Sequence, residues 1–266
     1  MSDLRIQYNE EMVGAGHPTK SDTLNRLMLA EHNHDGTHQQ QARGFRTGLA
    51  PAYHDGDTLT FNGGVLEIDG KLYSLSAATG VTFASLAADT SYWVYVTPPA
   101  TGNTLAAGDF SASTTAPTYS DSKHGWYNGS ARCIFGFITN GSGNIPAFRY
   151  SRGRVIYDGD ILAASITPSN VWTDVTLSIP AGISLMATAM IWNIYVDTQA
   201  YVLLRPKGSA TNRFATNYTE ANGQRTDAAQ EIFTDTNGRI QARFNVATAG
   251  NIINIYTHGY QLPEDM

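Results

Sequence analysis

The stretch VLEIDGKLYSL, residues 65–75, decides the fold of this chain. Two short runs of branched, aromatic and apolar residues flank Asp69 and Gly70. An Asp-Gly pair between two such runs is typical of the two-residue loop of a type I′ β-hairpin. The sequence therefore predicts antiparallel strands over residues 65–68 and 71–75.

Further strand patterns follow this hairpin. Residues 92–96, YWVYV, are aromatic and β-branched and end before two prolines, as expected of a strand. Residues 132–138 form another apolar run, which Asn140 and Gly141 close. These spacings predict an antiparallel β-sandwich or barrel over residues 51–153.

A second antiparallel sandwich is expected over residues 154–266, where the same style of sequence continues. Asn222-Gly223 and Asn237-Gly238 are expected to form turns. The predicted strands of this domain cover residues 171–179, 185–196, 201–205, 239–246 and 252–260.

Two Asp-Gly-Asp triplets, at residues 55–57 and 158–160, are expected to form turns at the entrances of the two domains. The polar segment 207–230 is too long for a hairpin turn. We expect it to be either functional or partly ordered by its own packing, and it is our first candidate for a contact surface.

The composition is that of a turn-rich β protein. At 266 residues, the chain is long enough for two domains of about 100–200 residues each, preceded by a terminal segment over residues 1–50. With a net charge of -6 and its Lys and Arg scattered, the chain is not expected to bind nucleic acid.

The chain has no apolar run near the ~18 residues of a membrane span and no signal-peptide core, so neither membrane insertion nor export is expected. The single cysteine, Cys133, is expected to be an inert buried thiol.

Residues 21–38 predict a short amphipathic helix that runs into a histidine-rich turn. Leu24, Leu27 and Met28 fall at helical spacing, and Asn33 and Gly36 end the helix. A helix of about three turns is marginal alone in water, so its apolar stripe needs a partner surface. We expect this segment to serve attachment and oligomerisation, with another copy of the chain as one candidate partner.

Three stretches together resemble bacteriophage tail and baseplate proteins. GHPTKSDTLNRLMLAEHNHDGTH, residues 16–38, resembles their N-terminal segment, in which a TLNR helix leads into an EHN-x-DGTH turn. SYWVYVTPPATGNTLAAGDFSAS, residues 91–113, and YSDSKHGWYNGSARCIFGFITN, residues 119–140, are similar to the β module that often follows it. The resemblance covers roughly residues 12–150, and the C-terminal domain matches in architecture only, as a tail-fibre head.

This resemblance implies a structural virion protein, a tail fibre or receptor-binding protein assembled in the host cytoplasm. Its N-terminus would attach to other tail or baseplate proteins, and its C-terminal domain would bind a bacterial surface glycan or protein. Such proteins are usually trimers, and in a homotrimer three copies would bury Leu24, Leu27 and Met28 together. The alternatives are an architectural baseplate or tail connector without receptor binding and, as a minor one, a glycan-degrading enzyme.

An enzyme is not expected from the residues themselves. Glycoside hydrolysis needs two carboxylates flanking a cleft, whereas the acidic residues here stand mostly in Asp-Gly turns or polar loops. The sequence contains no G-x-S-x-G elbow, H-E-x-x-H helix or Gly-rich phosphate loop. No cofactor is expected, with one possible exception at the histidines.

His32, His34 and His38 form an H-x-H-x3-H pattern. In some trimeric phage spikes an H-x-H pair from each chain surrounds one iron, so His32 and His34 are candidate ligands for iron or another transition metal at a trimer axis. The alternative, which we favour, is that these histidines donate hydrogen bonds that brace the turn.

Glycan binding requires an aromatic surface with amides and guanidinium groups around it. The C-terminal domain offers Trp172 and Trp192 among its aromatic residues. Trp192 shares strand parity with Met190, so we expect it in the core and Tyr195 outside, although core or intersubunit packing is the alternative for any single aromatic. The candidate receptor-binding residues are Tyr195, Tyr201, Arg213, Asn217, Tyr218, Asn222, Arg225 and, in the first domain, Trp126.

Overall fold

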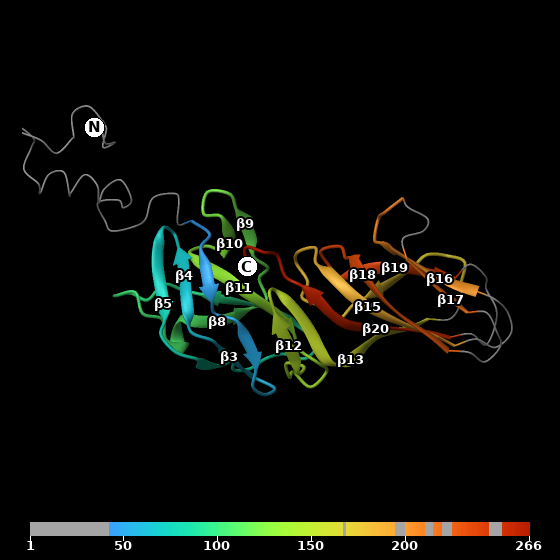
Figure 1. Cartoon of the computed structure of the whole chain (residues 1–266), viewed down its shortest axis with the longest axis horizontal. Helices are drawn as coiled ribbons and strands as arrows, with labels where there is room; N and C mark the ends of the chain where they lie inside the picture. The colour runs from blue at the N-terminus through green and yellow to red at the C-terminus, as the bar shows by residue number, and fades with distance from the viewer. Residues whose placement is uncertain (1–42, 167–168, 195–199, 211–214, 220–224, 245–251) are drawn as a thin grey trace, which may run out of the picture.

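The computed structural model describes residues 43–166, 169–194, 200–210, 215–219, 225–244 and 252–266 (Figure 1). Strands dominate these residues, which confirms the prediction of a mainly β fold with several antiparallel sheets. Within the described ranges, the one helical element is the 3-10 turn η2 (Ala107–Asp109). The helix predicted within residues 21–38, with Leu24, Leu27 and Met28, lies outside them.

The first part of the chain folds into an N-terminal lobe of three sheets, which contains strands β1 to β11 (Figure 1). One sheet has the order β1-β4-β5, a second β2-β3-β6 and the largest β8-β7-β11-β10-β9. All pairs between named strands are antiparallel. The strands are β1 (Arg46–Gly48), β2 (Pro51–Tyr53), β3 (Thr58–Phe61), β4 (Gly64–Ile68), β5 (Lys71–Leu75), β6 (Thr79–Thr82), β7 (Ser91–Val96), β8 (Phe110–Ser113), β9 (Thr118–Ser120), β10 (Gly125–Asn128) and β11 (Ala131–Ile138).

The predicted hairpin is present as β4 and β5. Asp69 and Gly70 both have positive φ angles, 52° and 88°, as the central residues of a type I′ turn require. Leu66 pairs with Tyr73 in the expected register. The predicted strands over residues 92–96 and 132–138 are confirmed as β7 and β11.

The second part of the chain forms a C-terminal sandwich of two sheets, with the orders β12-β13-β20-β15-β18 and β14-β19-β16-β17. Fully buried residues of the first sheet, such as Ile191 and Ile255, and of the second, such as Val202, Leu204 and Ile240, belong to one hydrophobic core. The strands are β12 (Phe148–Ser151), β13 (Arg154–Ile166), β14 (Thr173–Thr176), β15 (Met186–Ile194), β16 (Ala200–Pro206), β17 (Ala215–Thr219), β18 (Arg225–Phe233), β19 (Arg239–Phe244) and β20 (Ile252–Gln261).

The second Asp-Gly-Asp triplet, residues 158–160, is not the turn that we predicted. It lies inside the continuous strand β13, where the pairing with β20 shifts between Ile156 and Ile161. The backbone N–H of Asp158 donates to the carbonyl of Ala147 at 3.0 Å. A β-bulge thus absorbs the extra residues and the strand continues, because both neighbouring strands offer hydrogen-bond partners.

The described residues of the polar segment 207–230 include strand residues. Its backbone includes all of β17 and the start of β18, which pair with β16 and β15. Polar residues are compatible with a strand at a sheet edge, and both β17 and β18 are edge strands, where one side of the ladder is open.

Trp93 and Gly136 join the two parts of the molecule. They face each other in register on β7 and β11, and a Cβ at position 136 would stand 2.5 Å from the indole ring. The indole N–H of Trp93 donates a hydrogen bond to the backbone carbonyl of Ala181 at 3.0 Å. The hydroxyl of Tyr260 donates one to the backbone carbonyl of Gly136 at 2.6 Å. The hydrophobic core therefore runs without interruption from the N-terminal lobe into the C-terminal sandwich.

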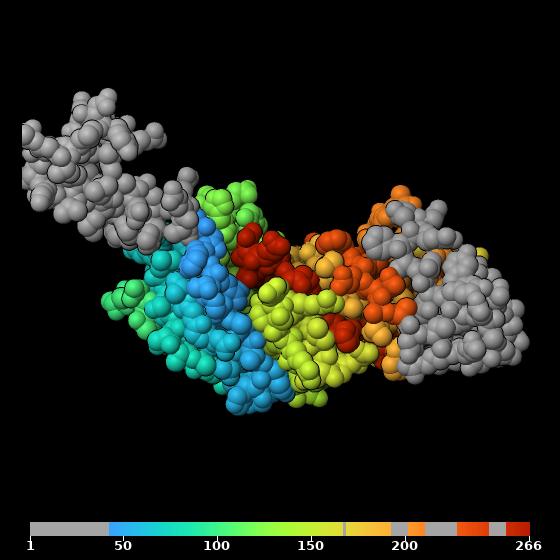
Figure 2. Space-filling view, viewed as in Figure 1, coloured from blue at the N-terminus to red at the C-terminus, as the bar shows by residue number. Residues whose placement is uncertain are grey.

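The C-terminal residues return to the N-terminal lobe. Met266 is buried and belongs to the shared core, and the backbone N–H of Leu262 donates to the carbonyl of Gly153 at 2.9 Å. Figure 2 shows these residues, in dark red, against the blue and green residues of the N-terminal lobe. The division into domains at residue 153 stays a prediction, but the two parts share packing on both sides of it.

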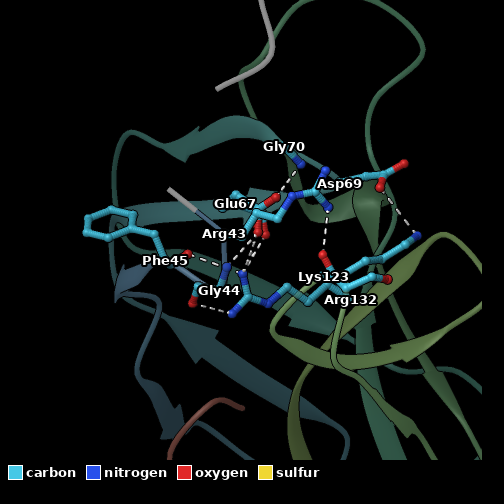
Figure 3. A network of polar contacts seen from close by, with 9 residues as sticks. Arg43, Gly44, Phe45, Glu67, Asp69, Gly70, Lys123 and Arg132 are labelled. Carbon is cyan, nitrogen blue, oxygen red and sulfur yellow. Dashed lines mark hydrogen bonds and ion pairs between the residues drawn. The ribbon is translucent and has the colours of Figure 1, made fainter. Parts of the chain in front are cut away.

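A buried ion pair fixes the first described residues, in an N-terminal clamp made of Gly44, Phe45, Glu67 and Arg132 (Figure 3). Both charged side chains are fully buried. The Arg132 guanidinium donates to the carbonyls of Gly44 at 2.7 Å and Phe45 at 3.2 Å, and lies 3.5 Å from the Glu67 carboxylate. That carboxylate accepts the backbone N–H groups of Gly44, at 3.0 Å, and of Gly70. Burial lowers the pKa of Arg132, and the nearby Tyr127 and Glu67 oppose that shift.

We expect Arg132→Met to lower the free energy of unfolding by about 3–5 kcal/mol, because the Glu67 carboxylate would stay buried without its cation. Urea denaturation of the full chain measures this. The matched control is Arg149→Met: the Arg149 side chain is 84% exposed in its ion pair with Asp158, so its loss should cost about 0–1 kcal/mol. Equal stability of the two variants would contradict the structural role of the clamp.

We expect Tyr260→Phe to lower the free energy of unfolding by about 1–2 kcal/mol, since it removes the hydrogen bond to Gly136 and leaves packing unchanged. The measurement is again urea denaturation. Tyr53→Phe is the control, because the Tyr53 hydroxyl has no hydrogen bond within the described part of the chain. An unchanged midpoint for Tyr260→Phe would show that this bond does not hold the two parts together.

Candidate functional site

The outer face of the sheet β14-β19-β16-β17 carries an unusual group of polar side chains. Alternation along β19 and β16 places Ile240, Ala242 and Leu204 in the core. Four polar residues at the intervening positions therefore stand on the outer face, and each is partly exposed. They are Arg239, Gln241 and Arg243 on β19, and Arg205 on β16.

Trp172 lies among these side chains. It immediately precedes β14, which pairs with β19. The Arg205 guanidinium carbon is 4.1 Å from the centroid of the Trp172 ring, and that of Arg243 is 4.7 Å from it. Such cation–π contacts orient both guanidinium groups and the indole together.

A chain of hydrogen bonds crosses the same face. Arg205 Nε donates to Gln241 Oε1 at 2.8 Å, and Gln241 Nε2 donates to Asp174 Oδ1 at 2.9 Å. The Asp174 carboxylate also accepts from Lys207 Nζ and lies 3.8 Å from Arg239 Nη1. These bonds, together with the sheet beneath them, hold the side chains in defined positions.

Arg243 differs from the other cations of this face. Within the described residues its side chain makes no hydrogen bond and no ion pair, and its Nε is buried without a hydrogen-bond acceptor. A buried donor without an acceptor is costly unless a ligand or water supplies one. We define the Trp172 surface as Trp172, Asp174, Arg205, Lys207, Arg239, Gln241 and Arg243, and take it as the candidate binding site.

The predicted binding residues are located as follows. Tyr201 pairs with Tyr218 in the backbone register of β16 and β17, and Asn217 lies beside Tyr218 on β17. Arg225 begins β18. The remaining predicted residues of this domain, Tyr195, Arg213 and Asn222, lie outside the described residues. The structure therefore places the backbones of Tyr201, Asn217 and Tyr218 in the same sheet as the Trp172 surface.

Trp126 does not join this group. It lies on β10 in the N-terminal lobe, partly buried, with its ring edge-on to Tyr119 at a centroid distance of 5.5 Å. It pairs in register with Tyr119 on the edge strand β9. Its setting is that of a cross-strand aromatic pair.

The prediction that Trp192 faces the core is wrong. On β15 the fully buried residues are Ala189 and Ile191, so the core face has the opposite parity. Trp192 is partly buried on the other face, with its ring 4.3 Å from that of Tyr256. Ala187, Ala189 and Ile191 occupy the core positions of β15, and Met190 and Trp192 lie on the opposite face.

Sequence reasoning missed most of the Trp172 surface, although one signal was present. Residues 239–244, RIQARF, alternate between polar and apolar side chains over the whole strand. That alternation predicts a half-exposed strand with Arg239, Gln241 and Arg243 on one face. The alternation does not by itself show which other strands contribute to the same polar face.

The predicted metal ligands His32 and His34 lie outside the described residues. Within the described ranges, no group of three or more His, Cys, Asp or Glu side chains could hold a metal ion. Cys133 is a free, buried thiol, and burial raises its pKa. No helix in the described ranges has the length and apolar character needed to cross a membrane.

Comparison with known proteins yields little. No family model matches the sequence, and no curated protein matches it. Among solved structures, the chain is similar to one named Major Tropism Determinant I1 Variant, with 21% identity and a TM-score of 0.30. The similarity covers 48% of this chain and 39% of that chain. A TM-score of this size does not establish a common fold.

We expect the carboxyl of Asp174 to titrate below its ordinary pKa of 3.8, because the hydrogen bonds from Lys207 and then Gln241 lower its pKa. Its interactions therefore stabilise the folded chain above that ordinary pKa, and this contribution is lost as the pH falls through the lowered one. Carbon-13 NMR titration of the carboxyl measures the midpoint. Lys207→Met should move it back toward 3.8, whereas Lys123→Met, which removes a similar pair with Asp69, should not. The same midpoint in all three proteins would contradict the network.

Proposed function

We propose that this chain is a structural protein of a phage tail that binds a bacterial surface glycan through the Trp172 surface. Two independent observations support the proposal. Residues 16–38 and the two stretches within residues 91–140 resemble phage tail proteins. The observation that carries the binding function is the position of Trp172 beside two guanidinium groups on one exposed sheet face.

The chemistry of the Trp172 surface suits a saccharide. An aromatic ring offers an apolar surface to the C–H face of a sugar, and amide and guanidinium groups bond to its oxygens. Arg205 and Gln241 are already joined by a hydrogen bond at 2.8 Å, so little side-chain freedom would be lost on binding. Strands position such groups more accurately than loops do.

The location of the surface fits a division between attachment and recognition. In Figure 1 the first described residues, in blue, lie in the N-terminal lobe, and β16, β17 and β19 lie at the other end of the molecule. The N-terminal clamp holds residues 44 and 45 on that lobe. The segment before them would attach to other tail or baseplate proteins, and the opposite end would be free to meet a cell.

Several parts of this proposal rest on the sequence resemblance alone. They are the homotrimer, the virion location, and the attachment to other tail proteins through residues 1–50. The proposed role is binding without catalysis.

We expect the full chain, labelled with a fluorophore, to bind a subset of an array of bacterial capsular, lipopolysaccharide and teichoic acid glycans. Trp172→Ala should weaken that binding by at least about ten-fold, since central aromatic anchors dominate binding energies. The full chain is required because the two parts share one core. Arg149→Ala, on β12, is the control and should bind as the wild type does.

Two results would contradict the proposal. Binding to no glycan on the array would favour an architectural connector. Equal binding by the wild type and Trp172→Ala would place the glycan site elsewhere on the chain. Release of reducing ends from a bound polysaccharide would instead favour an enzyme.

A further inference from the structure

We propose that the glycan recognised by the Trp172 surface is acidic, with a carboxylate or phosphate group that binds between Arg205 and Arg243. This inference rests on the proposed function and names the chemistry of the ligand. Three features support it: the positive charge of this face, the guanidinium N–H groups of Arg205 and Arg243 that have no acceptor, and the apolar surroundings of Arg243.

The charges of this face are unbalanced at one place. Lys207 and Arg239 share the Asp174 carboxylate, and Arg239 also pairs with Asp235 at 2.8 Å. Within the described residues, Arg205 and Arg243 have no carboxylate partner. The excess positive charge is therefore concentrated at the two guanidinium groups beside Trp172, on a chain whose net charge is -6.

Both guanidinium groups have donors to offer. In the described part of the chain, Arg205 makes a single side-chain hydrogen bond, through Nε to Gln241, so its two Nη groups have no acceptor. Arg243 makes none, and its two Nη groups, unlike its buried Nε, are exposed and have no acceptor. A planar guanidinium binds carboxylate or phosphate oxygens in pairs, which a neutral hydroxyl cannot match in charge.

The surroundings of Arg243 strengthen an interaction with an anion. Leu203 is its register partner on β16 and is only 4% exposed, although alternation places it outside the main core, between Val202 and Leu204. The apolar residue Leu203 at the neighbouring position on β16 and the Trp172 ring over which both guanidinium groups lie reduce solvent screening. An anion bound here would interact more strongly than one at a fully exposed arginine.

The test uses the full chain and immobilised polysaccharides of known charge. The acidic probes are polygalacturonate, alginate and a poly(glycerol phosphate) teichoic acid, and the neutral probes are dextran and pullulan. The bacterial glycans bound in the array experiment are tested before and after removal of their charges. Carboxyl reduction removes uronate charge, and hydrofluoric acid removes phosphate, so the two treatments distinguish the two sources of the anion.

We expect the bound glycans to be acidic and their binding to fall when the matching charge is removed. Arg205→Gln and Arg243→Gln should each weaken binding by about ten-fold or more, because each removes hydrogen bonds to a charged group. Arg243→Lys should give an intermediate loss, since the charge remains but the planar pair of donors is gone. Arg149→Gln changes the net charge equally and should leave binding unchanged.

The outcomes separate this inference from the proposed function. Binding that persists after both treatments, or that Arg243→Gln leaves unchanged, would overturn the acidic ligand and leave glycan binding intact. Binding that Arg149→Gln weakens as much as Arg243→Gln would show a general charge effect and also overturn it. If the wild type binds no glycan, the proposed function fails first.

Discussion

The contact between Trp93 and Gly136 is the constraint on which the arrangement of the whole molecule depends. The indole ring occupies the space that any side chain at position 136 would need. The same two residues also bond to the C-terminal sandwich, through the Trp93 indole N–H to Ala181 and the Gly136 carbonyl to Tyr260. Segments from four distant parts of the sequence meet there, so the relative position of the two parts is set by packing in a shared core rather than by a linker.

The Trp172 surface is a consequence of sheet pairing between distant segments. Trp172, Arg205 and Arg243 are separated by more than thirty residues in sequence, and the strands β14, β19 and β16 bring them together as neighbours. Neither Arg205 nor Arg243 is unusual by itself, because each is a partly exposed residue on a strand. Their proximity to one indole ring, with acidic partners engaged by Lys207 and Arg239 instead, gives the face its distinct chemistry.

The sequence predicted those features that depend on neighbouring residues. Asp69-Gly70 specifies its own turn, since both residues tolerate positive φ, and the aromatic and β-branched runs over β7 and β11 are typical of buried strands. The triplet at residues 158–160 has the same local chemistry as a turn, but it forms a bulge because β20 and the residues before β12 provide partners. The parity predicted for Trp192 was wrong because Ala187, Ala189 and Ile191 take the core positions of β15 through its pairing with neighbouring strands. The Trp172 surface could not be predicted as a unit, because its residues meet only through long-range pairing.

The N-terminal clamp has a mechanical consequence. Arg132 stands on β11, in the middle of the largest sheet of the N-terminal lobe, and bonds to the backbone of residues 44 and 45. Tension applied to the chain before residue 43 would pass through these buried bonds into β11 and from there, across Gly136 and Tyr260, into the C-terminal sandwich. A pull on the chain before residue 43 would thus load the central strand of the largest sheet of the N-terminal lobe through the Arg132 side chain, in addition to the backbone that continues into β1.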